Sequence, residues 1–170
     1  VPQWYYYFGG LADKVQGDAI PLDKKGYFNF TRHEPLGVLA VITPWNSPLL
    51  ILSWKLAPAL AAGGTVVIKP SSETPTVAAI FAETLLEAGF PSESFSFLPG
   101  SGSAVGDVLV EHPKTRFVSF TGSRDVGLRI NELAARPQKG QIWIKRIVAE
   151  MGGKDAIIVD DDCDLDAAVE

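Results

Sequence analysis

Short apolar runs alternate with longer segments from residue 36 to the end of the chain. The apolar runs are rich in valine and isoleucine and predict strands at 37–42, 65–69, 95–98, 116–120, 145–149 and 156–159. The segments between them predict helices at about 48–62, 75–88, 103–111 and 124–135, with another helix starting at 164. Uniformly apolar strands are typical of sheets covered on both faces. Their alternation with helices therefore predicts an α/β fold with a Rossmann-like, mostly parallel, doubly wound sheet.

The first 35 residues show a different pattern. Residues 1–16 carry a dense aromatic cluster over positions 4–8 and predict an amphipathic helix packed on a neighbour. Residues 17–35 hold turn residues around short alternating runs, which predicts a β-ribbon. We therefore divide the chain into a lead-in helix and β-ribbon (1–35) and an α/β domain (36–170).

Composition excludes several functional classes. The chain has 170 residues, of which 46% are hydrophobic, so it can bury a sizeable core. A net charge of −5 without a basic stripe argues against nucleic acid and anionic membranes as partners. No apolar run is long enough for a membrane helix. Cys163 is the only cysteine, which excludes an internal disulfide and fits a reducing compartment, so we expect a cytoplasmic protein.

Both ends of the sequence indicate a piece of a longer chain. The start at Val1 has neither an initiator methionine nor the pattern of a signal peptide. At the other end, residues 164–170 have an Asp cap and acidic residues typical of a first helical turn, and the sequence stops there. We therefore expect that further segments complete the protein.

Candidate chemistry lies in five segments that follow predicted strands, where open α/β sheets usually bind ligands. The glycine-rich segment 99–106 can bring backbone N–H groups close to a cofactor, although its spacing is not Gly-x-Gly-x-x-Gly and a tight turn explains it equally well. Ser123 in segment 120–123 can cap a helix whose N-terminus points at a ligand crevice, or it can cap the helix without any contact to a ligand. Lys69 can reach ribose hydroxyls or a phosphate, or extend into solvent.

Two further side chains fit reaction chemistry. Asn46, in Pro44-Trp45-Asn46, can donate its amide N–H to a developing oxyanion, but asparagine is also common in turns beside prolines. Glu150 ends a predicted strand beside two glycines and can act as a general base, although surface glutamates are far more numerous.

The order and spacing of these segments resembles the aldehyde dehydrogenase superfamily over essentially the whole chain. The resemblance rests on five motifs: 44–46 (Pro-Trp-Asn), 69–71 (Lys-Pro-Ser), 100–106, 120–123 (Phe-Thr-Gly-Ser) and 150–154 (Glu-Met-Gly-Gly-Lys). A narrower similarity to L-glutamate γ-semialdehyde (1-pyrroline-5-carboxylate) dehydrogenases, enzymes of proline catabolism, rests on 112–115, 121–127 and 145–155. Residues 37–75 fit any family member equally well.

The resemblance implies a function. Members oxidise aldehydes through a cysteine thiolate and pass hydride to NAD, or to NADP. Their pattern makes Asn46 the oxyanion donor and Glu150 the general base. It implies cofactor contacts for Ile42, Pro44, Trp45, Lys69, Ser72, Gly100, Gly106, Phe120, Thr121, Gly122, Ser123, Met151 and Gly152. It also implies a homo-oligomer assembled through segments equivalent to 1–35, and no metal.

Two departures from the family pattern matter. Many NAD-specific members have glutamate three residues after the lysine, whereas this chain has Ser72 there and Glu73 one position later, which leaves NADP open. The family nucleophile also lies further beyond Glu150 than this sequence extends. Cys163 is only 13 positions after Glu150 and has five carboxylates around it, which disfavour a thiolate, so we do not expect it to replace that nucleophile.

Alternatives to an oxidising enzyme remain. A noncatalytic, truncated relative that binds a dinucleotide or packs in an oligomer fits the same residues. An acyl-CoA-forming relative fits less well, because such enzymes commonly lack the base glutamate. The acidic run 160–164 starts like a calcium loop, but Leu165 stands where that loop needs glycine, so we expect no calcium site.

Overall fold

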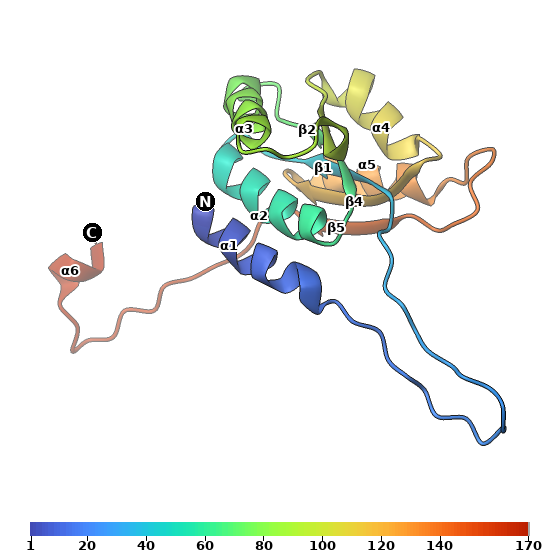
Figure 1. The fold of residues 1–170 in the computed structure, drawn as a ribbon. Helices are drawn as coiled ribbons and strands as arrows, with labels where there is room; N and C mark the ends of the chain where they lie inside the picture. Colours follow the sequence, from blue (N-terminus) through green and yellow to red (C-terminus); the bar gives the residue numbers. More distant parts are fainter. Residues whose placement is uncertain (170) are drawn as a thin grey trace.

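A computed structural model describes residues 1–169 and has five parallel strands at its centre (Figure 1). The strands are β1 (Val38–Ile42), β2 (Thr65–Lys69), β3 (Phe95–Phe97), β4 (Thr115–Thr121) and β5 (Arg146–Glu150). Their order is β3-β2-β1-β4-β5, so the chain builds outward from β1 in one direction and then crosses to its other side. This order confirms the predicted Rossmann-like parallel sheet.

Helices cover both faces of the sheet (Figure 1). α2 (Pro48–Ala61) and α3 (Pro75–Glu87) cover one face, and α4 (Asp107–Glu111) and α5 (Arg124–Ala135) cover the other. The strands alternate between these layers: Leu39 and Val41 join the core under α2, whereas Ala40 and Ile42 join the core under α5. Burial on both faces explains why the strands are continuously apolar.

Local sequence sets the starts of these helices. Proline occupies the first turn of both α2 and α3, where its missing N–H costs nothing. Ser123 caps α5 by accepting a hydrogen bond from the backbone N–H of Val126. The helix predicted at 103–111 is instead two pieces, a π-helical turn at Gly102–Gly106 followed by α4.

The aromatic cluster at the start of the chain lies on α1 (Pro2–Leu11), which packs on α2 and α3. Trp4 meets Trp54 edge-on at 6.3 Å between ring centroids, and Tyr5 meets Phe81 at 6.0 Å. This contact agrees with the amphipathic helix predicted there. Short 3₁₀ turns follow at Ala12–Lys14 and, before β3, at Ser92–Ser94.

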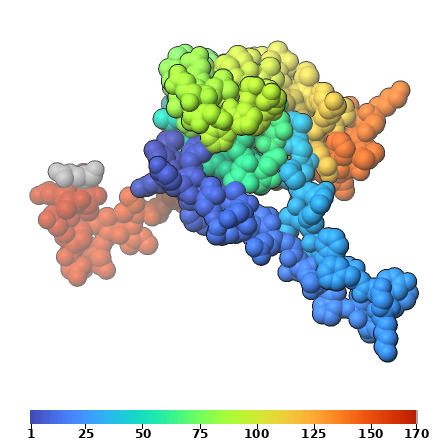
Figure 2. Space-filling model, viewed as in Figure 1, coloured from blue at the N-terminus to red at the C-terminus, as the bar shows by residue number. Residues whose placement is uncertain are grey.

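Residues 17–35 form a long excursion away from the sheet (Figures 1 and 2). The predicted ribbon is reduced to a single antiparallel bridge between Ala19 and Phe30. Two backbone hydrogen bonds flank it, Ile20 N to Asn29 O and Thr31 N to Asp18 O. A two-stranded segment without a covering surface gains too little burial to form regular strands, which explains the difference.

The strand predicted at 156–159 is wrong in the described residues. Segment 151–159 leaves the sheet in an extended path and ends at the short helix α6 (Leu165–Val169) (Figure 1). Ile157 and Ile158 are 89% and 93% exposed. An apolar run becomes a strand only where it pairs with another, and this segment pairs with none in residues 1–169. In the same range, no helix is long and apolar enough to cross a bilayer.

Candidate functional site

The loops after β1, β2, β4 and β5 enclose a hollow of about 670 Å³ at one edge of the sheet, here called the edge crevice. Parallel strands bring their carboxyl ends to one edge, so these loops meet although they are far apart in the chain. Ten residues proposed from the sequence line the edge crevice: Pro44, Trp45, Asn46, Lys69, Ser72, Phe120, Thr121, Gly122, Ser123 and Gly152.

A smaller cavity of about 310 Å³, here called the side cavity, adjoins the edge crevice. The two hollows share Lys69, Gly102 and Val126. Ile42 and Gly106, also proposed from the sequence, line the side cavity together with Ile130. The side cavity therefore continues the edge crevice between the π-helical turn and α5, which gives the site two connected compartments.

Lys69 lies at the junction of the two compartments and is only 5% exposed. Its ammonium Nζ donates a hydrogen bond to the backbone oxygen of Pro70 at 2.9 Å. Burial lowers the pKa of Lys69. Its stem passes Gly106, where a Cβ would lie 3.5 Å from Lys69 Cε. The positive charge is therefore held at a fixed place in the site.

Gly100 supports the site from outside its lining. Its φ of +148° strains any other residue, and a Cβ there would lie 2.5 Å from Val105 Cγ2. Ser72 Oγ donates to the backbone oxygen of Gly100 at 3.3 Å. This bond joins the loop after β2 to the glycine-rich loop after β3.

Glu150 lies beside the edge crevice but faces another hollow. It ends β5 and lines a cavity of about 400 Å³ under α2, here called the rear cavity, together with Trp54 and Lys55. Thr121 connects the two regions, because it lines the edge crevice while its Oγ1 donates to Glu150 Oε2 at 3.1 Å. The structure thus brings Glu150 next to the crevice that Asn46 lines without making Glu150 part of its wall.

Met151 follows Glu150 and packs against α5. A Cβ built at Gly127 would lie 2.5 Å from Met151 Sδ and 3.2 Å from Phe120 Cε1. The side chain therefore rests where α5 has no side chain of its own. The absence of a side chain at Gly122 similarly leaves room for the ring of Phe120, whose Cζ would lie 2.6 Å from a Cβ there.

The sequence reasoning missed Lys55. Only 9% of it is exposed, and its Nζ donates to Ser119 Oγ at 3.0 Å. Burial lowers the pKa of Lys55, and the nearby Glu150 carboxylate partly offsets that effect. A signal for it existed, because Lys55 is the only charged residue in the mostly apolar helix α2. It places a cation in the rear cavity with Glu150.

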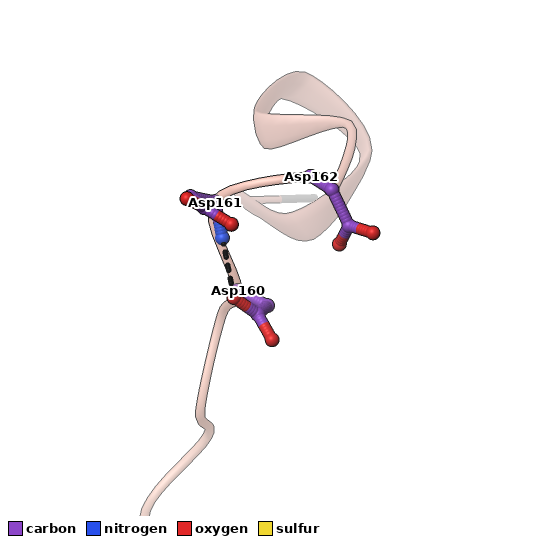
Figure 3. Close-up of side chains that lie close together, drawn as sticks. All are labelled: Asp160, Asp161 and Asp162. Carbon is purple, nitrogen blue, oxygen red and sulfur yellow. Dashed lines mark hydrogen bonds between the residues drawn. The ribbon is translucent and has the colours of Figure 1, made fainter.

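The acidic run lines neither hollow and lies at the turn just before α6 (Figure 3). Asp160, Asp161 and Asp162 are exposed and bring one carboxylate oxygen each within 4.8 Å of one another. The bond drawn between them is internal, from Asp161 N to Asp160 Oδ1 at 2.8 Å. No group from another element of residues 1–169 joins the cluster, so we assign it no role. Cys163 follows directly and is partly exposed.

Comparison with known proteins identifies the family of this chain. The family model described as "Aldehyde dehydrogenase family" matches residues 1–170. The 1-pyrroline-5-carboxylate dehydrogenases of Geobacillus thermodenitrificans and Bacillus cytotoxicus are 54% and 52% identical over 165 residues, which is 96% of this chain and 32% of each relative. The chain therefore spans about a third of the length of these curated relatives.

Solved structures give the same result. Betaine aldehyde dehydrogenase from Staphylococcus aureus, in complex with NAD+, matches with a TM-score of 0.87 and 42% identity, over 98% of this chain and 32% of that one. PnpE in complex with nicotinamide adenine dinucleotide matches with a TM-score of 0.86 and 45% identity, over 98% of this chain and 33% of that one. With the family match over its full length, this chain belongs to the aldehyde dehydrogenase family.

Proposed function

We propose that the chain forms the NAD-binding part of an aldehyde dehydrogenase that oxidises L-glutamate γ-semialdehyde to glutamate. The observation that carries the proposal is the pair of connected hollows at the carboxyl edge of the sheet, lined by most of the residues that the family pattern assigns. The substrate rests on the two relatives described above as 1-pyrroline-5-carboxylate dehydrogenases, at 52–54% identity.

The two hollows suit the two kinds of group in a dinucleotide. The side cavity offers apolar walls from Ile42, Val126 and Ile130, which fit an adenine base. The edge crevice offers Lys69 for ribose or phosphate oxygens and the start of α5, at Ser123, for the pyrophosphate. In this proposal the nicotinamide end is completed by Phe120, Thr121, Gly122, Met151, Gly152, Pro44 and Trp45. Two solved relatives hold NAD, and Ser72 leaves NADP as a second ligand.

The reaction assigns roles to two side chains. A thiolate adds to the aldehyde carbon, and Asn46 donates its amide N–H to the oxygen that becomes negatively charged. NAD, held in the edge crevice by residues such as Lys69 and Ser123, would supply the acceptor for the hydride of that carbon, whose loss leaves a thioester. Glu150 then removes a proton from the water that attacks the thioester, which releases the acid and the thiol. Glu150 must turn from Thr121 to reach this water, a movement of one side chain.

The thiol in this proposal comes from outside residues 1–170. Cys163 lies in the turn region that follows the acidic cluster, and it does not line the edge crevice. Cys163 is absent from the lining that contains Asn46, so it is unsuited to attack an aldehyde held there.

The test compares two proteins. The 170-residue chain should bind NAD in calorimetric titration and produce no NADH with the semialdehyde. The natural enzyme that contains these residues should produce NADH, and its Asn46→Ala and Glu150→Gln variants should lose activity by at least a hundredfold. Cys163→Ser should retain full activity. Absence of NAD binding would refute the cofactor assignment, and aldehyde oxidation by the 170-residue chain would refute the origin of the thiol. NAD binding without oxidation by the natural protein would indicate a noncatalytic relative.

The proposal includes self-association through residues 1–35. The excursion exposes Tyr27, Phe28 and Phe30 at 63%, 80% and 60%, and it protrudes from the rest of the chain (Figure 2). Replacing all three with serine should reduce the mass measured by light scattering to that of one chain. An unchanged mass would refute this assembly surface.

A further inference from the structure

One charged pair on the wall of the side cavity has no role in the reaction described above. Arg129 of α5 holds Asp107 of α4 through two hydrogen bonds, Nε to Oδ1 at 3.1 Å and Nη2 to Oδ2 at 2.6 Å. The arginine side chain is 58% exposed and the aspartate 20% exposed. This two-point contact fixes the orientation of the guanidinium plane as well as its position.

Both members of this pair line the side cavity. The other walls are Ile42, Val126 and Ile130, together with Lys69, Ser103 and the two glycines of the π-helical turn. A compartment with apolar walls and one oriented guanidinium suits a flat, aromatic ligand group, because such a group stacks on the face of a guanidinium while its own faces stay out of water.

The ion pair with Asp107 also indicates whether Arg129 contacts a phosphate or an aromatic base. Its charge is already balanced by Asp107, whose pKa the Arg129 hydrogen bond lowers, so the carboxylate is ionised at neutral pH. A balanced cation attracts a phosphate weakly. The edge of the guanidinium that carries Nε and Nη2 is also occupied by Asp107, which leaves its flat faces for contact.

We propose that Arg129 is a specificity-determining residue of the cofactor site, whose guanidinium stacks on the purine base in the side cavity, and that Asp107 is the positioning residue that fixes its plane. This inference rests on the proposed function, because it assigns the purine base of a dinucleotide to the side cavity. It makes base recognition in this chain depend on an ion pair between two helices.

The experiment measures fragments of the cofactor by calorimetric titration on the full chain. ADP-ribose carries the base, nicotinamide mononucleotide lacks it, and 2′-phospho-ADP-ribose adds a phosphate. Arg129→Ala should weaken ADP-ribose binding about tenfold, the size expected when a base loses one stacking partner, and leave nicotinamide mononucleotide unchanged. Arg129→Lys should lose nearly as much, because lysine keeps the charge but has no plane. Asp107→Asn should lose about threefold, and in the active enzyme all three variants should raise the KM for NAD without changing kcat.

The matched control is Arg136→Ala. Arg136 is the C-cap of α5, has a side chain that is 56% exposed and pairs with Glu132 of the same helix, so it is an exposed, paired arginine that does not line the side cavity. Its variant should bind all three fragments like the wild type. Unchanged binding of nicotinamide mononucleotide reports that a variant is folded.

The outcomes separate the two proposals. ADP-ribose binding within twofold of wild type in Arg129→Ala would overturn the stacking role. Full rescue by Arg129→Lys, or a loss confined to 2′-phospho-ADP-ribose, would overturn it in favour of a charge contact. If the wild-type chain binds none of the fragments, the proposed function itself fails.

Discussion

A methyl group added at Gly127 tests the contact between α5 and the loop that follows β5. Gly127 is buried in α5, and a Cβ there would lie 2.5 Å from Met151 Sδ and 2.7 Å from Met151 Cγ. Real Cβ atoms do not approach so closely, so Met151 must move. The ring of Phe120 is 3.2 Å away and only 3% exposed, so it must also shift slightly.

Two opposing terms set the magnitude. Alanine in place of glycine inside a helix stabilises it by about 1 kcal/mol. Extra volume in a packed region costs roughly 1–3 kcal/mol. Met151 is 38% exposed and has three flexible bonds, so the lower end of that range applies. We therefore expect Gly127→Ala alone to change the free energy of unfolding by less than about 1 kcal/mol.

Removing the Met151 side chain should make the stabilisation from the higher helix propensity of alanine measurable. In a Met151→Ala background the clash with Met151 is absent and only the tight contact with Phe120 remains, so Gly127→Ala should stabilise the chain by nearly the full ~1 kcal/mol. The two substitutions should therefore couple by about 1 kcal/mol, measured by urea unfolding of all four proteins. The same effect of Gly127→Ala in both backgrounds would refute the contact.

Three further predictions concern single side chains. Tyr5→Phe should raise the free energy of unfolding by about 1 kcal/mol in urea titrations, because the Tyr5 hydroxyl is buried without a hydrogen-bond partner in the described residues; a loss above 1 kcal/mol would show that the hydroxyl is bonded. Lys55→Met should flatten the alkaline stability profile: the folded pKa of Lys55 lies below the ordinary 10.5, so the unfolded chain binds more protons between those two values and wild-type stability rises with pH there. The check is thermal unfolding of both proteins between pH 7 and 10.5. The same dependence of the unfolding temperature on pH in wild type and Lys55→Met would contradict this prediction. Ser72→Glu should weaken NADP binding about tenfold, because the new carboxylate repels the 2′-phosphate, and should leave the affinity for NAD unchanged. Fluorescence titrations measure both affinities. Equal losses for the two cofactors would show that the 2′-hydroxyl binds elsewhere.

The sequence predicted the sheet well because its strands are continuous apolar runs. Each strand from β1 to β5 lies within a residue or two of its expected place, since burial on both faces leaves a strong local signal. The run at 156–159 had the same signal and formed no strand. The run at 156–159 differs from β1 to β5 in a non-local property, because strand formation requires a neighbouring strand, and the local sequence does not show whether one is present.

The site was predictable to the level of loops, and side-chain directions were not. The motifs after the strands meet at one edge because parallel topology requires it. The pairs Glu150–Lys55 and Asp107–Arg129 depend instead on how helices pack on the sheet and on each other. Such pairs have no fixed spacing in the chain. Nothing in the sequence near Glu150 indicates that it faces the rear cavity.

The strand order described above has a consequence for how the chain folds. β1 pairs with β4 from Val38 to Thr115, residues that are 77 positions apart, whereas Val38 and its β2 partner Thr65 are 27 apart. Closing the longer loop costs only about 1 kcal/mol more, because the entropy grows with the logarithm of length. The larger effect of this separation is on the time at which β1 and β4 can pair. During synthesis, β1 has an unpaired edge until β4 leaves the ribosome, and such edges promote aggregation. Among the strands that are paired on both sides in residues 1–169, β1 therefore keeps an open edge for the longest part of synthesis.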